Sequence, residues 1–195
     1  MVPAASCFTA TGDLDRAAFQ SNIDAYVGHG VDGVLVAGSS GESALLDDED
    51  RRQLLTWARA RLSDDQWLLA GVGSESTRQT ISRAHDAKAA GANAALVISP
   101  HYFLKRMTEP ALLAHFRAVA DASPLPVLLY NMPAYAHLVL SPAFVHEMAQ
   151  HENVIGMKDS AGNIPVFTQY LESQGPTFRV LTGSGATVVP ALAAG

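Results

Sequence analysis

The 195-residue sequence has little cysteine and a deficit of positive charge. Its single cysteine, Cys7, excludes an internal disulfide bond and favours a reducing compartment. Thirteen lysines and arginines stand against 19 aspartates and glutamates, and no basic block is present, so neither nucleic acid nor an anionic membrane is expected as a partner. No apolar run approaches the roughly 18 residues that span a bilayer, and no signal peptide is apparent. We therefore expect a cytoplasmic protein, or a mitochondrial one if a presequence has been removed.

The chain contains short apolar segments that alternate with amphipathic stretches. Hydrophobic residues make up 48% of the sequence, which suits one soluble globular domain with a substantial core. Near-continuous apolar segments bounded by glycine, serine or proline are typical of parallel strands covered on both faces. Seven such strands are predicted, over residues 2–8, 32–37, 67–72, 94–98, 126–130, 153–157 and 178–181.

Helices are predicted between these strands from their start and stop signals. Asp47 and Ser76 have the position of N-caps, and Ser141 precedes a proline at a first helical position. Gly30 and Gly91 follow helical stretches, where a left-handed C-cap residue is favoured. The helices and strands therefore alternate along the whole chain.

Strict alternation predicts a parallel sheet, either open and doubly wound or closed as a (β/α)8 barrel. A repeat of about 30 residues matches a barrel of eight units, which usually takes about 250 residues. Seven strands and seven helices are predicted here. We therefore expect one domain over residues 1–195, a TIM barrel truncated after the seventh βα unit and lacking the eighth unit.

Polar residues follow the predicted strands, at the end where parallel α/β folds place their chemistry. They include one lysine, two tyrosines and several hydroxyl groups. In chain order the candidates are Ser39, Ser40 and Gly41 after the second strand, Tyr102 after the fourth, Tyr130 at the fifth, Lys158 and Ser160 at the sixth, and Ser184 after the seventh.

This set of residues suits Schiff-base chemistry. The neutral amine of Lys158 would attack a ketone, and the resulting iminium would withdraw electrons from the neighbouring carbon. Tyr130 would relay protons to and from the carbinolamine and the leaving group. Ser39 and Ser40, in a glycine-flanked turn, would cradle the carboxylate of a keto acid.

Each of these residues also has a simpler reading. A lone lysine at a strand end more often extends to water, and a lone tyrosine is more often a core residue. The glycine-containing turns after the third and seventh strands do not complete a dinucleotide-binding motif, so no cofactor is expected. The seven histidines are scattered without a metal-binding spacing, and His101, His115 and His137 are expected at the surface or a polar rim.

Several motifs together resemble one family. "GSSGES", "YNMP" and "GMKDSAGN", with "SPHYF" and "VLTGSG", resemble the pyruvate-dependent class I aldolase superfamily of dihydrodipicolinate synthase and N-acetylneuraminate lyase. The resemblance covers nearly the whole chain. It implies a (β/α)8 barrel followed by a small helical region, and a homo-oligomer, commonly a tetramer built as a dimer of dimers.

The resemblance also implies residue roles. Lys158 corresponds to the Schiff-base lysine and Tyr130 to the proton-relaying tyrosine. Ser39 and Ser40 match the hydroxyl pair that binds the keto-acid carboxylate, and Ser40 is assigned to the relay as well. Tyr102 matches a tyrosine that in many members reaches a neighbouring subunit's site. The expected ligands are pyruvate and an aldehyde, with neither a metal nor a cofactor.

Two departures bear on the substrate. Tyr135 stands where dihydrodipicolinate synthases carry an arginine, and Ala136–His137 replaces their usual Thr-Gly. Residues 67–77, 119–134 and 151–163 look closer to the 4-hydroxy-2-oxoglutarate aldolase branch. We therefore rank first a carbon–carbon lyase that converts 4-hydroxy-2-oxoglutarate to pyruvate and glyoxylate. The alternatives are a dihydrodipicolinate synthase, a sugar-acid lyase or dehydratase, or an inactive truncated protein that binds keto acids or another subunit.

Overall fold

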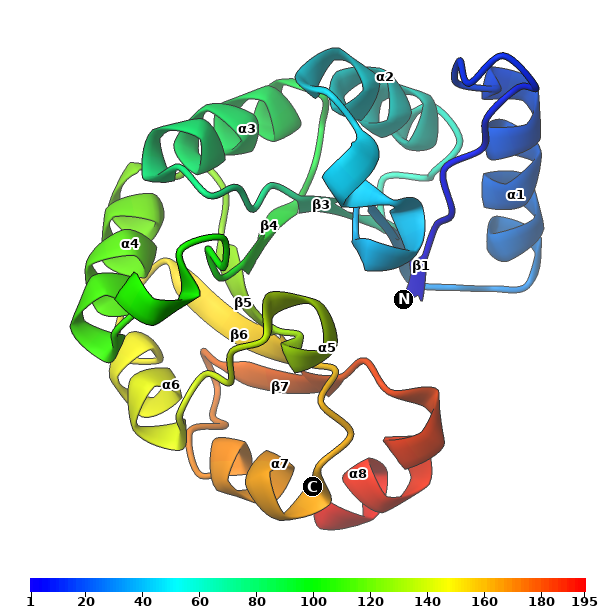
Figure 1. Cartoon of the computed structure of the whole chain (residues 1–195). Helices are drawn as coiled ribbons and strands as arrows, with labels where there is room; N and C mark the ends of the chain where they lie inside the picture. Colours follow the sequence, from blue (N-terminus) through cyan, green and yellow to red (C-terminus); the bar gives the residue numbers. More distant parts are fainter. The chain divides into compact units, whose positions relative to one another are not determined.

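The computed structural model describes residues 1–195 and shows parallel strands alternating with helices (Figure 1). Residues 1–72 and 82–96 form one compact unit, called here the N-terminal unit. Residues 73–81 and 97–195 form the second, the C-terminal unit. Helix α3 (Thr77–Ala89) and strand β4 (Ala94–Ile98) contribute residues to both.

The N-terminal unit is a parallel sheet whose strands pair in sequence order. Strand β1 pairs with β2, β2 with β3, and β3 with the first residues of β4. The elements are β1 (Val2–Pro3), α1 (Arg16–Gly28), β2 (Gly33–Val36), two short 3-10 helices (Ser39–Gly41 and Ser43–Leu45), α2 (Asp48–Arg59) and β3 (Trp67–Gly71).

Apolar side chains explain why these elements pack together. All four residues of β2 are buried, as expected for a strand covered on both faces. Helix α1 buries Phe19 and Ile23, and α2 buries Leu54, Leu55 and Ala58 at helical spacing. The core of this unit therefore lies between the sheet and its helices.

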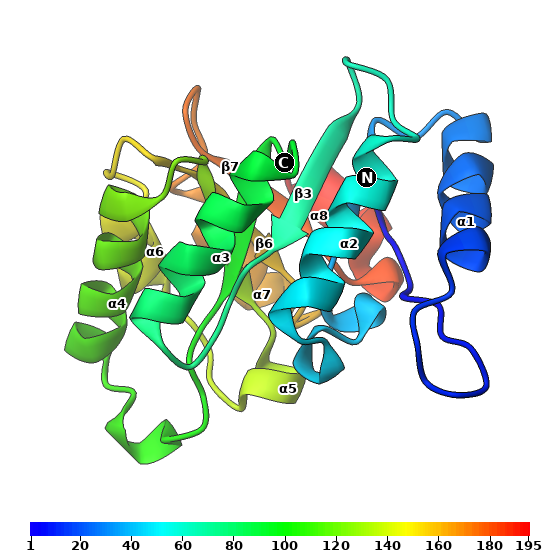
Figure 2. The ribbon, with the colours of Figure 1, turned by 90° about the horizontal axis from the view of Figure 1, so that it is seen from above.

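The C-terminal unit repeats the same pattern. Strand β5 pairs in parallel with β6, and β6 with β7. After β4 the elements are a 3-10 helix (Leu104–Arg106), α4 (Glu109–Ala122), β5 (Val127–Asn131), α5 (Pro133–Ala136), α6 (Pro142–Met148), β6 (Val154–Asp159), α7 (Ile164–Leu171), β7 (Arg179–Thr182), a 3-10 helix (Gly185–Thr187) and α8 (Val188–Ala194). Figure 2 shows α5 and the segment between β4 and α4 at the same end of this unit.

The predicted strands are confirmed in number and order, and the fold class is confirmed as βα repeats of a TIM barrel. The first strand is much shorter than predicted and ends at Pro3, and Phe8 instead forms an isolated antiparallel bridge with Leu14. The sixth strand is longer than predicted and ends at Asp159. Lys158 therefore lies inside the strand, in the register of the sheet.

The predicted helix signals are also confirmed. Asp47 caps α2 in a reciprocal capping box, and the Ser141 hydroxyl accepts a hydrogen bond from Phe144 N at the start of α6. At the start of α3, the Ser76 hydroxyl accepts a hydrogen bond from Gln79 N. Gly30 and Gly91 have positive φ angles of 74° and 85°, where a side chain would be strained.

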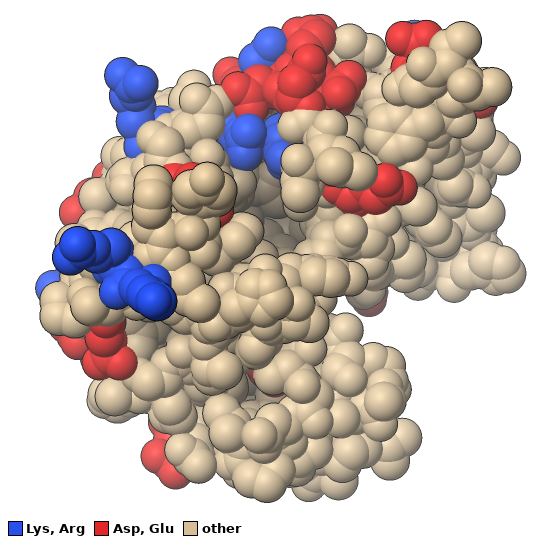
Figure 3. Space-filling model, in the orientation of Figure 1, with Lys and Arg blue, Asp and Glu red and all other residues tan.

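The surface differs in charge from place to place. Figure 3 shows acidic and basic side chains gathered over the region of α2 and α3, whereas the face over α8 carries none. Helix α8 exposes Val189 and Leu192. None of the helices combines the length and the apolar character needed to cross a membrane.

Candidate active site

Tyr130 and Lys158 are neighbours on adjacent strands of the C-terminal unit. The register of β5 and β6 pairs Tyr130 with Lys158, and the lysine Nζ lies 4.6 Å from the centroid of the tyrosine ring. Tyr130 is 4% exposed, whereas Lys158 is half-buried. The amine therefore lies over an aromatic face, on a side chain that is still partly exposed to solvent.

Ser160 and Gly183 complete the surroundings of this amine. A Cβ atom at Gly183 would lie 2.5 Å from Lys158 Cε and 2.2 Å from Ser160 Oγ. Both side chains thus occupy the space that a larger residue at 183 would fill. The Ser160 hydroxyl is buried and has no hydrogen-bond partner, which is unusual for a polar group in a folded protein. The Ser160 hydroxyl therefore keeps its hydrogen-bonding capacity unused beside the Lys158 side chain.

Ser184 lies one residue further along the same chain segment. Its backbone N–H donates to Thr182 Oγ1 at 3.4 Å, and its side chain is near Gly162, in the loop after Lys158. The Gly183 N–H donates to Asp159 O at 2.7 Å, which extends the β6–β7 pairing to this point. The loops after β6 and β7 are therefore joined just beyond the lysine.

Asn131 and Asp159 form a second, buried pair next to the first. Their exposed fractions are 1% and 2%, and Asn131 Nδ2 donates to Asp159 Oδ1 at 2.7 Å. Burial raises the pKa of the Asp159 carboxyl, and the hydrogen bonds from Asn131 and from the Ala161 N–H oppose that shift. This pair was not among the predicted site residues, although it directly follows Tyr130 and Lys158 in the sequence.

The serine turn, defined as residues 37–45, belongs to the N-terminal unit. Ser39, Ser40 and Gly41 form a 3-10 helix in which Gly41 N donates to Gly38 O at 3.0 Å. Ser40 is exposed and Ser39 half-buried. Ala37 and Glu42, on either side, both have a φ of 54°, a left-handed conformation that non-glycine residues rarely adopt. The turn therefore presents one exposed serine, Ser40, to solvent.

A buried arginine braces the serine turn. Arg51, on α2, is 6% exposed, and its guanidinium donates to Gly71 O at 3.2 Å and to Ser43 O. Burial lowers the pKa of Arg51 to about 10. The sequence carried a signal for this residue, because Arg51 shares the helical face of Leu54, Leu55 and Ala58.

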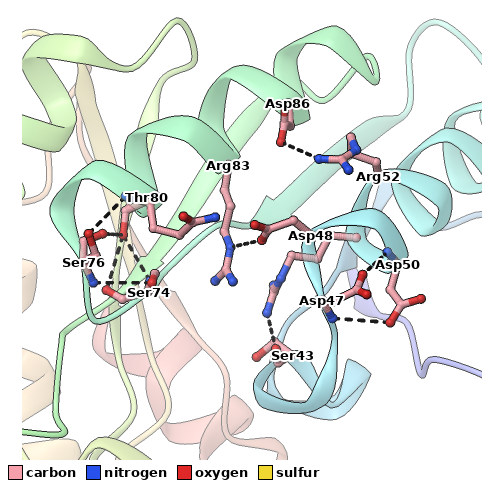
Figure 4. A network of polar contacts seen from close by, with 12 residues as sticks. Ser43, Asp47, Asp48, Asp50, Arg52, Ser74, Ser76, Thr80, Arg83 and Asp86 are labelled. Carbon is pink, nitrogen blue, oxygen red and sulfur yellow. Dashed lines mark hydrogen bonds and ion pairs between the residues drawn. The ribbon is translucent and has the colours of Figure 1, made fainter.

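Ion pairs between α2 and α3 surround this brace. Figure 4 shows Asp48 facing Arg83, at 2.7 Å, and Arg52 facing Asp86, at 3.1 Å. The charges on the two helices are thereby paired, which explains the mixed patch over this region of the surface.

Tyr102 lies on an exposed loop of the C-terminal unit. Its side chain is 76% exposed, and its ring meets Phe103 edge to face at 4.9 Å between centroids. The Glu75 carboxylate accepts hydrogen bonds from the backbone N–H groups of His101 and Tyr102, both at 2.9 Å. The loop is therefore anchored through its backbone while the tyrosine ring is open to solvent.

The predicted site residues thus fall into three groups. Lys158, Tyr130 and Ser160 meet in the C-terminal unit, with Ser184 nearby; Ser39, Ser40 and Gly41 share one turn of the N-terminal unit; Tyr102 is exposed on a loop. The expectation for His115 was wrong. It is 7% exposed on α4, where its Nδ1 lies 2.8 Å from Thr77 Oγ1, and burial lowers its pKa to about 4.

Comparisons with known proteins find relatives along nearly the whole chain. The model of the dihydrodipicolinate synthetase family matches residues 1–195. A 4-hydroxy-tetrahydrodipicolinate synthase of Stenotrophomonas maltophilia (strain K279a) is 39% identical over 191 residues, which are 98% of this chain and 64% of the relative. A probable mitochondrial 4-hydroxy-2-oxoglutarate aldolase of Emericella nidulans is 39% identical over 188 residues, 94% of this chain and 61% of the relative.

Solved structures give the same result. A prophage protein of the dihydrodipicolinic acid synthase family from E. coli K12, in complex with pyruvate, superposes with a TM-score of 0.93 at 33% identity. The match covers 100% of this chain and 66% of that one. The chain therefore spans slightly less than two thirds of the length of these relatives. With the family model matching from the first residue to the last, the chain belongs to the dihydrodipicolinate synthetase family.

Proposed function

We propose that this protein is a carbon–carbon lyase of the class I aldolase type that forms a Schiff base with pyruvate through Lys158. The observation that carries the proposal is the group around that amine. Its Nζ lies 4.6 Å from the Tyr130 ring centroid, and the buried, unpaired Ser160 hydroxyl lies beside the same side chain. The family supports it, because relatives are named as synthases and aldolases.

The proposed cleavage proceeds by proton transfers at named groups. The Lys158 amine adds to the ketone carbon of a 2-oxo acid, and loss of water from the carbinolamine leaves an iminium. The bond between C3 and C4 then breaks; its electron pair moves toward the iminium nitrogen to give an enamine, while the C4 hydroxyl loses its proton and becomes an aldehyde. Protonation of the enamine and hydrolysis release pyruvate and the free amine. Tyr130 carries the protons, and the iminium serves as the electron sink without metal or cofactor.

The remaining site residues enter the proposal through the sequence motifs. Ser39, Ser40 and Gly41 are proposed to bind the keto-acid carboxylate, with Ser40 also in the proton relay. Ser160 and Ser184 are proposed as further substrate ligands. Tyr102 is proposed to reach the catalytic site of a neighbouring subunit in a homo-oligomer. Its ring is exposed to solvent, as this role requires.

The proposed substrate is 4-hydroxy-2-oxoglutarate, cleaved to pyruvate and glyoxylate. Tyr135, in place of the arginine of dihydrodipicolinate synthases, favours this reaction over condensation with aspartate semialdehyde. The residue is 60% exposed on α5, immediately after β5. The second candidate is 4-hydroxy-tetrahydrodipicolinate synthase, the activity for which several relatives at 32–39% identity are named. A sugar-acid lyase or dehydratase is a third possibility within the family.

Borohydride trapping tests the Schiff base directly. The purified chain is incubated with pyruvate and sodium borohydride, and intact mass and peptide mapping locate any adduct. We expect one reduced pyruvyl adduct on Lys158, none in Lys158→Met, and an unchanged adduct in Lys88→Met, which removes an exposed lysine from α3. A folded wild-type chain without an adduct would exclude the proposed chemistry.

Turnover assays separate the candidate reactions. Release of pyruvate and glyoxylate from 4-hydroxy-2-oxoglutarate supports the aldolase, whereas pyruvate-dependent consumption of aspartate semialdehyde supports the synthase. The assays are also run with sugar acids as substrates. If an adduct forms but none of these substrates is turned over, the protein is instead a keto-acid-binding protein, the alternative considered from the sequence.

A further inference from the structure

The two strands that carry Tyr130 and Lys158 hold a second pair of facing residues one position further on. The register pairs Asn131 with Asp159, directly after Tyr130 with Lys158. Successive side chains of a strand point to opposite faces of the sheet, so the second pair lies on the face opposite the reactive amine. Any group that fixes Asn131 to Asp159 also fixes the backbone from which Tyr130 and Lys158 project.

A chain of hydrogen bonds occupies that opposite face. Asn131 Nδ2 donates to Asp159 Oδ1 at 2.7 Å, and the Asn131 Oδ1 atom accepts from Leu140 N at 3.1 Å. The Tyr170 hydroxyl, from α7, donates to Leu140 O at 2.6 Å. Tyr170 Oη also lies 3.4 Å from Asn131 Nδ2. Three elements and a loop are therefore joined through one asparagine.

These groups are all shielded from water. The exposed fractions of Asn131, Leu140, Asp159 and Tyr170 are 1%, 1%, 2% and 0%. Water cannot replace a lost partner at such positions, so removal of one member leaves another polar group unpaired. The geometry of the cluster is consequently more rigid than that of a hydrogen-bonded group at the surface.

The cluster also determines where the segment after β5 returns. Residues 132–140 leave the sheet after Asn131, form α5, and come back to the same asparagine side chain through Leu140 N. Tyr135, which the proposed function takes as the residue that favours 4-hydroxy-2-oxoglutarate, lies within that loop. The cluster thus connects the strand carrying the amine to the loop carrying the substrate-distinguishing residue.

We propose that Asn131, Asp159 and Tyr170 are positioning residues that hold the Tyr130 hydroxyl and the Lys158 amine in the geometry required for proton transfer. This inference rests on the proposed function. The three residues act through the backbone of β5 and β6 and through Leu140, on the face of the sheet away from the ligand. Their loss should therefore slow imine formation more than it weakens the binding of pyruvate.

Tyr170→Phe is the most selective test, because it removes only the hydroxyl that donates to Leu140 O. The rate constant of imine formation, measured by quenching with borohydride over a range of pyruvate concentrations, should fall by about ten- to hundredfold. The pyruvate concentration at half-saturation should change much less. Tyr26→Phe is the matched control, since it removes the hydroxyl of a half-buried tyrosine on α1 and should leave the rate unchanged.

Two variants at Asp159 distinguish positioning from simple loss of packing. Asp159→Asn keeps an acceptor for Asn131 Nδ2 and should retain most of the wild-type rate, whereas Asp159→Leu leaves the asparagine unpaired and should not. Amide hydrogen exchange provides a readout independent of activity, with faster exchange expected at residues 132–140 in Tyr170→Phe.

The outcomes separate this inference from the proposed function. If the wild-type chain forms no adduct, the proposed function fails and the inference fails with it. If the wild type is trapped but Tyr170→Phe and Asp159→Leu are trapped at the wild-type rate, the Schiff base stands and only the positioning role is overturned. The positioning role is also overturned if Tyr170→Phe lowers the rate of imine formation and the affinity for pyruvate equally while amide hydrogen exchange at residues 132–140 is unchanged.

Discussion

The serine turn of the N-terminal unit is shaped by its backbone, whereas the surroundings of Lys158 in the C-terminal unit are shaped by side chains. In the turn, two non-glycine residues have a φ of 54°, and backbone carbonyls receive the stabilising hydrogen bonds from Gly41 N, Ser43 N and Arg51. Around the lysine, close packing against Tyr130, Ser160 and Gly183 sets the geometry. The backbone of the serine turn holds Ser40 exposed to solvent, whereas the packing around Lys158 restrains a long, flexible side chain.

The units also differ in how they accommodate buried ionisable groups. Burial lowers the pKa of Arg51 only to about 10, with the carboxylates of Asp48, Asp47 and Asp50 opposing the shift, so the guanidinium remains a cation at neutral pH. In the C-terminal unit, burial favours the neutral forms of Asp159 and His115. The first unit therefore uses a buried charge as a brace, whereas in the second unit burial shifts the pKa of each group toward its neutral form. This contrast predicts different responses to substitution and to pH.

The largest effect is expected from Gly183→Ala. The added Cβ would lie 2.5 Å from Lys158 Cε, so the lysine side chain must move away from its place beside Tyr130. We expect imine formation with pyruvate to slow by about a hundredfold or more, because a displacement of about 1 Å at a reacting group has effects of that size. The borohydride-trapping rate measures this.

Gly185→Ala is the matched control for that substitution. A Cβ at Gly185 would meet no atom within 4 Å, and neither glycine has a φ that a side chain would strain. The control should therefore trap pyruvate at the wild-type rate. Equal rates in Gly183→Ala and wild type would show that side-chain packing does not set the lysine geometry.

The next largest effect is expected from Arg51→Met. The substitution leaves the carbonyl oxygens of Ser43 and Gly71 without their buried donor, and each such loss costs about 1–3 kcal/mol. We expect the free energy of unfolding to fall by about 3–4 kcal/mol in urea denaturation. Arg52→Met, which removes an exposed arginine paired with Glu49 and Asp86, should change it by less than about 1 kcal/mol. Similar values for both variants would contradict the bracing role.

A pH effect is expected from His115 in the C-terminal unit. Its folded-state pKa of about 4 lies below the ordinary value of 6.5, so below pH 6.5 the unfolded chain binds a proton that the folded chain does not. The corresponding stability is fully present above pH 6.5 and is lost progressively as the pH falls toward 4, by about 2–3 kcal/mol.

The measurement is the free energy of unfolding between pH 7 and pH 4. His115→Gln should remove this contribution and show a correspondingly shallower pH dependence, whereas His146→Gln, at an exposed position of α6, should follow the wild type. Parallel profiles for the wild type and His115→Gln would contradict the buried, neutral histidine.

The smallest effect is expected at Glu42 in the serine turn. Its φ of 54° is strained for any residue with a side chain, so Glu42→Gly should raise the free energy of unfolding by about 0.5–1 kcal/mol. Glu42→Ala tests the same position without relieving the backbone and should give no increase. If both variants change the free energy of unfolding equally, the backbone of the serine turn is not strained at residue 42.

The sequence by itself determined the strands, the helix ends and the identity of the candidate residues. Apolar segments bounded by turn residues identified all seven strands, because burial on both faces of a parallel strand requires such segments. Local signals at Asp47, Ser141, Gly30 and Gly91 identified helix ends, because capping depends on residues adjacent in the chain. Lys158 and Tyr130 were recognisable from motifs at the ends of two of those strands.

Only the tertiary structure decided which side chains meet and which are shielded from water. The contact of Gly183 with Lys158 and Ser160, and the hydrogen bond from Tyr170 to Leu140, join residues that are 23–30 positions apart or belong to different elements. The burial of His115 likewise depends on its neighbours in space, which its polar character alone does not reveal. Periodicity reports the local conformation of a segment, whereas register and packing between segments depend on the shape and volume of side chains distant in the sequence.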